Sequence, residues 1–253
     1  MGKYNSRPGM KKIDIGVRKV APTYGLAALV THVGKGGGTL LFDNPAEQLV
    51  ARLLGLDPRV RHFQRQPFTV DLVERRLLRT SEERDVARQQ YAGRPGPSLY
   101  TPDFNVEHEG RRFIAVEVKL EGFPGQDADS ERMRQAADVL KHYGHEFLRV
   151  AVPADLAHPI RANTGLMHQA ALRKDVQPAA DVVERIERLA DGGARTVADF
   201  IIGLGISVDY LPSLVVHGVL SMDLITHRME GRSPAEAAYG SLQHLELLDR
   251  LAA

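Results

Sequence analysis

The chain has 253 residues, of which 43% are hydrophobic and none is cysteine, and its formal net charge is +1. A chain of this length can bury a sizeable core, and we expect two domains. The lack of cysteine excludes disulfides, thiol redox chemistry and cysteine-ligated metal sites. No stretch approaches the length of a membrane span and the first residues form no apolar signal region, so we expect a cytoplasmic protein with no membrane partner.

The small net charge conceals an asymmetry along the chain. Residues 175–253 contain six arginines, no lysine and twelve acidic residues, a balance of −6, which leaves +7 for residues 1–174 because the whole chain is +1. Residues 1–42 contain seven lysines and arginines and a single acid. This composition is typical of an arm that neutralises DNA phosphates, although a solvated terminal segment can share it. The candidate DNA contacts in the arm are Lys3, Arg7, Lys11, Lys12, Arg18 and Lys19.

A glycine-rich stretch and an amphipathic helix follow. Residues 34–39 lack the spacing of a nucleotide-binding phosphate loop, so we expect a flexible loop there. Asn44 is a good capping residue, Pro45 follows it, and apolar residues recur at helical spacing, which predicts a helix over 44–54. Glu47 lies at the edge of the apolar stripe, where its carboxylate can point toward the core or interact with the helix dipole.

Residues 55–68 are expected to turn and continue as an extended segment, and residues 69–99 have the composition of an insertion. Within the insertion we expect a charged helix over 71–90, followed by a connector rich in proline and glycine at 92–98. The arginines of the expected helix can face DNA or simply solvent.

The next segment predicts a β-hairpin that carries charged side chains. Residues 113–120 are rich in β-branched and aromatic residues, which predicts a strand, and residues 103–107 form the expected partner strand. Because side chains alternate between the two faces of a strand, Glu117 and Lys119 are expected on one face.

Asp103 adds a second carboxylate to that face. It falls diagonal to Glu117 if the hairpin loop ends at Gly110, and directly opposite Glu117 if the loop is centred on Gly110. Neighbouring carboxylates repel, and a divalent cation between them relieves the repulsion; oxygen ligands favour Mg²⁺ or Mn²⁺. Lys119 could then orient an attacking water or stabilise charge on a phosphate, as metal-assisted phosphodiester hydrolysis requires. Ordinary cross-strand ion pairing is the alternative explanation.

The segment after the hairpin continues the α/β pattern. We expect a loop over 122–130, a helix over 131–143 and a strand over 146–152. A strand, a helix and a second strand in this order fit one side of an α/β sandwich.

The remaining residues are mostly helical. Short helices separated by glycine over residues 181–220 suggest a helix-turn-helix or winged-helix-like domain. Its acidic balance repels phosphates and favours a protein partner over DNA. We expect an apolar docking patch, rimmed by carboxylates, that includes Leu211, Leu214 and Val215.

Four short motifs over residues 44–122, about a third of the chain, occur in an order that resembles the PD-(D/E)XK nucleases and, within them, the TnsA family. The motifs are the helix with glutamate, Asp-Pro-x-Val-x-x-Phe-x-x-Gln, Tyr-Thr-Pro-Asp-Phe and Val-Glu-Val-Lys. The resemblance implies a restriction-endonuclease-like α/β sandwich with a mixed central sheet flanked by helices, followed by a small, mainly helical, winged-helix-like domain. The implied ranges are a basic arm at 1–42, the nuclease domain at 43–173 and the C-terminal domain at 174–253.

The resemblance also implies roles for individual residues. Glu47 matches the helix glutamate of the family, Asp103 its metal-ligating aspartate, Glu117 the second ligand and Lys119 the catalytic lysine. Asp103, Glu117 and Glu47 would together hold Mg²⁺ or Mn²⁺. Gln66 matches a recurrent glutamine that gives polar support to the site. Some family members have glutamine in place of Glu117, and the acidic residue here favours metal binding.

The function implied by the resemblance is that of a bacterial endonuclease subunit in a TnsABC-like transposition system. It would cut one strand, the 5′ strand, at the transposon ends in duplex DNA, while a TnsB-like DDE transposase cuts the other. A TnsC-like AAA+ ATPase would engage the C-terminal domain. A stand-alone PD-(D/E)XK restriction or phage DNA-processing nuclease is one alternative, and a non-catalytic DNA-binding adaptor with the same fold is another.

Removal of residues 1–19 is expected to weaken binding to duplex DNA and to flatten its salt dependence, because six basic side chains no longer release phosphate counterions. The slope of log K against log salt should become shallower by up to about 5 if all six contact phosphates. A full-length variant with all six changed to glutamine controls for the loss of chain and should behave like the truncated protein. An unchanged slope in both would assign the arm to folding or to a protein partner.

Overall fold

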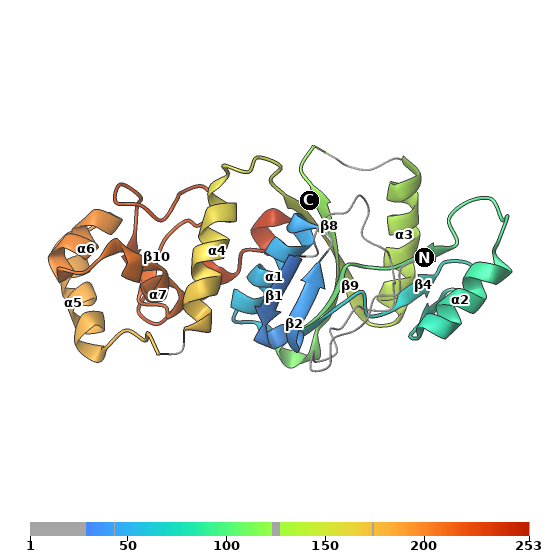
Figure 1. Ribbon diagram of the computed structural model, residues 1–253, viewed down its shortest axis with the longest axis horizontal. Helices are drawn as coiled ribbons and strands as arrows, with labels where there is room; N and C mark the ends of the chain where they lie inside the picture. Colours follow the sequence, from blue (N-terminus) through green and yellow to red (C-terminus); the bar gives the residue numbers. More distant parts are fainter. Residues whose placement is uncertain (1–28, 43, 123–126, 174, 253) are drawn as a thin grey trace, which may run out of the picture. The chain divides into compact units, whose positions relative to one another are not determined.

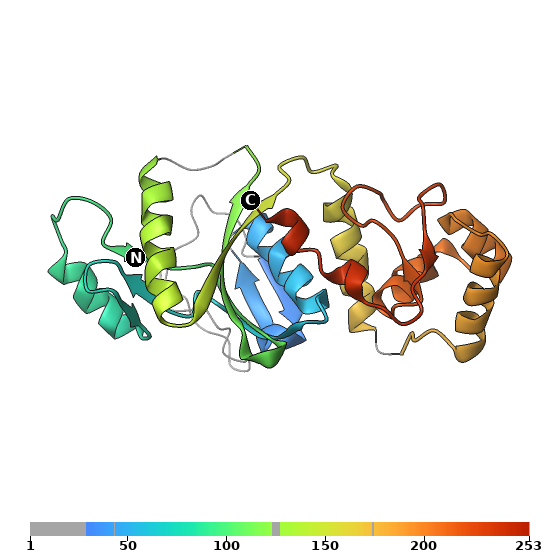
Figure 2. The same ribbon diagram turned by 180° about the vertical axis from the view of Figure 1, so that it is seen from behind.

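The computed structural model describes residues 29–42, 44–122, 127–173 and 175–252 (Figure 1 and Figure 2). Contacts divide the chain into two compact units, each built from three stretches of sequence. Unit 1 takes its residues from 1–48, 62–117 and 125–148, and unit 2 from 49–61, 118–124 and 149–253. The domain ranges suggested by the sequence are continuous, unlike these units, and they stay a prediction.

The candidate site residues Glu117 and Lys119 lie on a four-stranded sheet, of which β8 and β9 are labelled in Figure 1. Its strand order is β3-β7-β8-β9, the sheet is mixed and helices flank it, so the α/β class expected from the sequence is confirmed. The strands are β3 (Val60–Arg65), β7 (Phe104–His108), β8 (Phe113–Leu120) and β9 (His145–Val152). The helices that precede β3 and β9 in the chain are α1 (Pro45–Leu56) and α3 (Asp127–His142).

Helix α1 begins where the capping signal predicts. The side chain of Asn44 accepts a hydrogen bond from the amide of Ala46 at 2.8 Å, and its carbonyl accepts one from the amide of Gln48 at 3.1 Å. Pro45 occupies the first helical position, where its missing N–H leaves no hydrogen bond unmade.

A smaller sheet corrects the prediction of one helix over residues 71–90. Its strand order is β5-β4-β6, and only the last part of the expected helix is helical. The elements are β4 (Thr69–Asp71), β5 (Arg76–Leu78), α2 (Ser81–Gln90) and β6 (Leu99–Tyr100).

The reason for this difference is a turn capped by a buried carboxylate. Asp71 has no exposed surface, and its Oδ1 accepts hydrogen bonds from the amides of Val73 and Glu74, both at 3.0 Å. Helix α2 begins only after this turn, at a capping box in which Thr80 and Glu83 each bond the other's backbone amide.

The glycine-rich residues 34–39 also differ from the expectation of a flexible loop. Strand β1 (Leu29–Val33) pairs antiparallel with β2 (Gly38–Phe42), and a single 3₁₀ turn, Gly34–Gly36, joins them. Gly37 follows with φ of 83°, a left-handed conformation that glycine adopts without steric cost. The stretch is therefore an ordered hairpin turn.

Strands β7 and β8 are packed on both faces. On one face, the ring of Phe104 lies 6.3 Å from that of Phe42 and 5.8 Å from that of Phe63. On the other face, Ala115 belongs to a core cluster that includes Tyr100 and one side of helix α3. The buried α3 residues in this cluster are Met133, Ala136, Val139 and Leu140.

Unit 2 contains the helical C-terminal region (Figure 2). Its helices are α4 (Pro159–Leu172), α5 (Ala180–Asp191), α6 (Val197–Leu204) and α7 (Leu211–Val216). Its short antiparallel sheet pairs β10 (Leu220–Ser221) with β11 (Glu236–Ala237). The short helices expected over residues 181–220 are present as α5, α6 and α7, and α6 starts at a capping box of Thr196 and Asp199. Helix α4 has no counterpart in the sequence prediction.

Helix α7 corrects the predicted docking patch. Leu211, Leu214 and Val215 have no exposed surface, so they belong to the core and cannot contact a partner. The large hydrophobic side chains that unit 2 does expose lie elsewhere. They include Leu156, Leu166, Leu172, Ile202, Val208 and Tyr239.

Across the described ranges, no single helix is both long and apolar enough to cross a membrane. The segments Val197–Leu204 and Val208–Val216, taken together, have the length and apolar composition of a membrane span, but a bend of 110° separates them.

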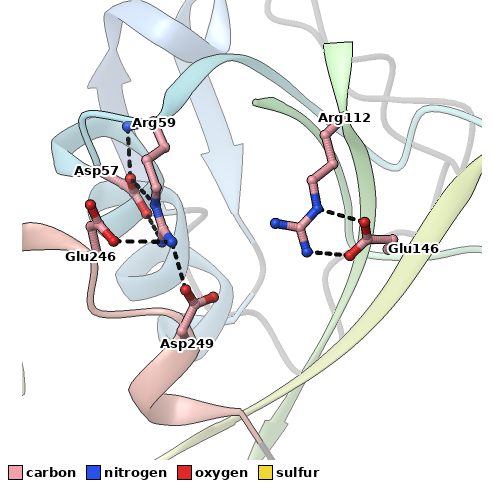
Figure 3. A network of polar contacts seen from close by, with 6 residues as sticks. All are labelled: Asp57, Arg59, Arg112, Glu146, Glu246 and Asp249. Atoms are coloured by element: carbon pink, nitrogen blue, oxygen red, sulfur yellow. Dashed lines mark hydrogen bonds and ion pairs between the residues drawn. The ribbon is translucent and has the colours of Figure 1, made fainter. Parts of the chain in front are cut away.

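An arginine joins three carboxylates in unit 2 (Figure 3). The guanidinium of Arg59 donates to Asp57 at 2.8 Å and to Asp249 at 2.6 Å, and it lies 3.1 Å from Glu246. The side chain of Asp57 has no exposed surface, and its Oδ1 also accepts the Arg59 amide at 2.9 Å. The hydrogen bonds that Arg59 donates to the Asp57 carboxylate are the main reason that the pKa of Arg59 is raised above its usual value.

Arg59→Ala is expected to lower the free energy of unfolding by about 2 to 4 kcal/mol, because the buried Asp57 loses its cation. Arg134→Ala is the matched control, since its ion pair with Glu131 is solvent-exposed and its loss should change the free energy of unfolding much less. Urea unfolding of both variants measures the difference. Equal losses would show that the Arg59 cluster does not stabilise the fold.

Candidate active site

The register of β7 on β8 decides where the predicted carboxylates lie. Phe104 pairs with Val116, and the register is centred on Gly110. One step beyond the last pair, the same register sets Asp103 opposite Glu117. Of the two registers considered from the sequence, the structure therefore has the one in which the carboxylates are directly opposed.

The hairpin turn that sets this register uses two left-handed residues. Gly110 has φ of 77° and Arg111 has φ of 61°, and the amide of His108 donates to the carbonyl of Arg112 at 2.9 Å. The side chain of Arg112 then forms a bidentate ion pair with Glu146 of β9 (Figure 3), which lowers the pKa of Glu146.

Glu117 is buried, with 6% of its surface exposed, and it lies two residues along β8 from Ala115, which packs in the cluster with α3. Lys119 lies two residues further and is half-buried. Strand alternation therefore places both charged side chains on the face of Ala115. Glu117 and Lys119 share a face because both lie on β8, and this does not depend on how β8 pairs with β7.

Tyr100 fixes the orientation of Glu117. Its hydroxyl donates to Oε2 of Glu117 at 2.6 Å, and both side chains are buried. Burial, followed by the nearby charge of Glu117, raises the pKa of Tyr100 well above its usual value, and Asp103 adds to the effect. The phenol therefore stays protonated and remains a donor. Tyr100 begins the Tyr-Thr-Pro-Asp-Phe motif, but its role as the donor to Glu117 is not predicted by the sequence pattern.

Gln66 lies where the chain passes from the central sheet to the smaller one. Its backbone is left-handed, with φ of 43°, and its amide donates to the carbonyl of Asp103 at 2.9 Å. Its side chain is buried, and Oε1 has no hydrogen-bond partner among the residues that the structure describes. An orphaned buried acceptor is unfavourable, and a cation or its bound water would relieve it. The supporting role of Gln66 stays a prediction.

Glu47 lies in the first turn of α1, as predicted, and contacts a buried arginine. Nη2 of Arg65 donates to Oε2 of Glu47 at 3.3 Å, and the same guanidinium lies 5.3 Å from the ring centroid of Phe42. The side chains of Arg65 and Glu47 are 4% and 14% exposed. Glu47 therefore takes part in a largely buried ion pair in the structure.

The described parts of the chain contain no group of three histidine, aspartate or glutamate side chains that could hold one metal ion. The structure brings together Asp103 and Glu117, and Glu47 as a third ligand stays a prediction. The donors of the pair are oxygen atoms only, which suits a hard cation such as Mg²⁺ or Mn²⁺. The orphaned oxygen of Gln66, a residue bonded to Asp103, is consistent with that fit.

The predicted DNA contacts of the basic arm lie outside the described residues. They are Lys3, Arg7, Lys11, Lys12, Arg18 and Lys19. Of the predicted arm, the structure describes only residues 29–42, which form the β1–β2 hairpin.

No protein-family model matches this chain, and no curated protein is significantly similar to it. The relation to the TnsA family accordingly stays a prediction from four short motifs. The geometry around Glu117 is independent of that resemblance.

Tyr100→Phe is expected to lower the free energy of unfolding by about 1 to 3 kcal/mol, because the buried Glu117 loses a donor. Tyr91→Phe is the matched control: the Tyr91 hydroxyl donates to buried Asp71 at 3.0 Å, on the smaller sheet. Both variants should lose similar stability in urea unfolding. Only Tyr100→Phe should weaken Mn²⁺ binding measured by calorimetry, and equal Mn²⁺ affinity in the two variants would separate Tyr100 from the site.

Proposed function

We propose that this protein is a DNA endonuclease that uses Mg²⁺ or Mn²⁺ and has the restriction-endonuclease-like fold of the TnsA family. The observation that carries the proposal is the β7–β8 register, which supports one shared face for Asp103, Glu117 and Lys119. The same three side chains would also suit ordinary ion pairing. The buried position of Glu117 and its hydrogen bond from Tyr100 favour a site over a solvated pair.

The proposed chemistry uses the side chains already described. A bound divalent cation would supply Lewis-acid catalysis and a lowered pKa for an attacking water. The carboxylates of Asp103 and Glu117 would hold the cation, and Tyr100 keeps Glu117 in one orientation through its hydrogen bond. The ammonium of Lys119 would offset the negative charge that develops on the scissile phosphate, or orient the water. Gln66 would support Asp103 through its backbone contact.

The proposed partners are duplex DNA at transposon ends, a TnsB-like DDE transposase and a TnsC-like AAA+ ATPase. In this scheme the protein cuts the 5′ strand and the transposase cuts the other. Helices α5 to α7 with the β10–β11 pair are compatible with a winged-helix-like domain. The balance of −6 over residues 175–253 supports docking to a protein, because an acidic surface repels phosphates.

Asp103→Ala and Lys119→Ala are expected to lower strand cleavage by at least about a hundredfold while the protein remains folded. Glu107→Gln is the matched carboxylate control, because it lies on β7 on the same face as Asp103, about 13 Å further along the strand. Lys141→Ala, at an exposed position of α3, is the control for lysine. Nicking of an end-labelled duplex with Mg²⁺, transposase and ATPase present measures the effect.

Cleavage at the wild-type level by either site variant would contradict the catalytic assignment. Cleavage by the wild-type protein without partners would favour the stand-alone nuclease. Salt-dependent duplex binding with no cleavage under any of these conditions would favour the non-catalytic adaptor.

A further inference from the structure

Helix α3 places an arginine close to the proposed site. The helix packs on the face that carries Glu117, since Met133 shares a buried cluster with Tyr100 and Ala115. Arg132 immediately precedes Met133, and about a third of its side chain is exposed. Arg132 also lies one helical turn before Ala136, which belongs to the same buried cluster as Tyr100, so it lies on the side of α3 that faces this cluster.

The contacts of Arg132 leave part of its guanidinium unused. Its Nη2 donates to Asp129 at 2.7 Å, while its buried Nε has no hydrogen-bond partner among the described residues. Arg134, on the same helix, forms an ion pair with the same spacing but uses both Nε and Nη2 on Glu131. Arg132 therefore uses fewer of its guanidinium donors in its ion pair than Arg134 does.

A positive charge at this position would offset the repulsion between the site carboxylates and the phosphates of DNA. Two carboxylates on one face repel the phosphates of an approaching DNA strand. A planar guanidinium binds phosphate through two parallel hydrogen bonds, with donors that an ammonium cannot arrange in the same way. Arg132 offers this group on helix α3, which packs against Tyr100, the residue that donates to Glu117.

We propose that Arg132 binds a phosphate of the DNA strand that enters the Asp103–Glu117 site, exchanging its ion pair with Asp129 for that phosphate. The inference rests on the proposed nuclease function. It assigns Arg132 to substrate binding, and it makes Asp129 a competitor that holds the guanidinium when DNA is absent.

The test measures the dissociation constant of a mixed-sequence duplex as a function of salt, in EDTA and in an Asp103→Asn background that cannot cleave. Arg132→Gln should weaken binding by about tenfold and make the salt slope shallower by about 0.9, the value for one phosphate contact. Arg134→Gln, the matched control, should stay within about twofold of the parent. Arg132→Lys should keep the slope but bind less tightly than the parent.

A second pair of variants tests the exchange without removing the arginine. Asp129→Asn should tighten duplex binding, because the competing carboxylate is gone, whereas Glu131→Gln should not. These substitutions leave Arg132 in place. They therefore test whether Arg132 exchanges Asp129 for a phosphate even if circular dichroism shows that Arg132→Gln does not fold.

The possible failures are distinguishable. If the parent binds duplex in a salt-dependent manner but Arg132→Gln matches Arg134→Gln, the inference is wrong and the proposed function stands. If Arg132→Gln tightens Mn²⁺ binding in the wild-type background without changing DNA affinity, Arg132 only offsets the charge of the carboxylates, and the inference is again wrong. If the parent does not bind duplex at all, the proposed function fails together with the inference.

Discussion

The pairing of β7 with β8 is the constraint on which the candidate site depends. Side chains alternate on a strand, so a slip of one residue would turn Glu117 onto the face where Phe104 packs against other aromatic rings. A carboxylate buried among those rings would lack hydrogen-bond partners and would strongly destabilise the fold. The left-handed turn at Gly110 and Arg111 fixes the same register from the other end. Core packing and turn geometry therefore agree, which leaves one arrangement available.

Much of the fold can be predicted from signals that are local in the sequence. The capping residue Asn44 and the capping box at Thr196 each mark the start of a helix, and the structure has both. The helix expected over residues 71–90 fails because Asp71 caps a turn there, and one of the contacts that hold this carboxylate in place is not local. Tyr91 donates to Asp71 from twenty residues away, and burial of that carboxylate favours a turn and two short strands over a helical continuation. The hydrophobic periodicity of residues 71–90 does not reveal the hydrogen bond between Tyr91 and Asp71.

The sequence predicts only the part of the site whose side chains lie on the same strand. Glu117 and Lys119 are two residues apart, so alternation alone places them together. Tyr100 reaches Glu117 from a strand of the other sheet, and a sequence pattern cannot reveal that hydrogen bond. Gln66 is harder still, because a left-handed glutamine costs about 1 to 2 kcal/mol locally. The left-handed backbone of Gln66 persists because the chain passes from one sheet to the other at this residue, and because the Gln66 amide donates to the carbonyl of Asp103. Backbone strain of this kind is concentrated at functional sites.

The Arg59 cluster has a consequence for how the protein is made. Arg59 and its partner Asp249 are separated by 190 residues. At a synthesis rate of about 5 to 20 residues per second, Arg59 leaves the peptidyl transferase centre about 10 to 40 s before Asp249 exists. Unit 2 needs residues 49–61 as well as 149–253, so it cannot close while the ribosome is still translating the segment between them. Residues 49–61 must therefore remain without their C-terminal partners until residues 149–253 have been synthesised.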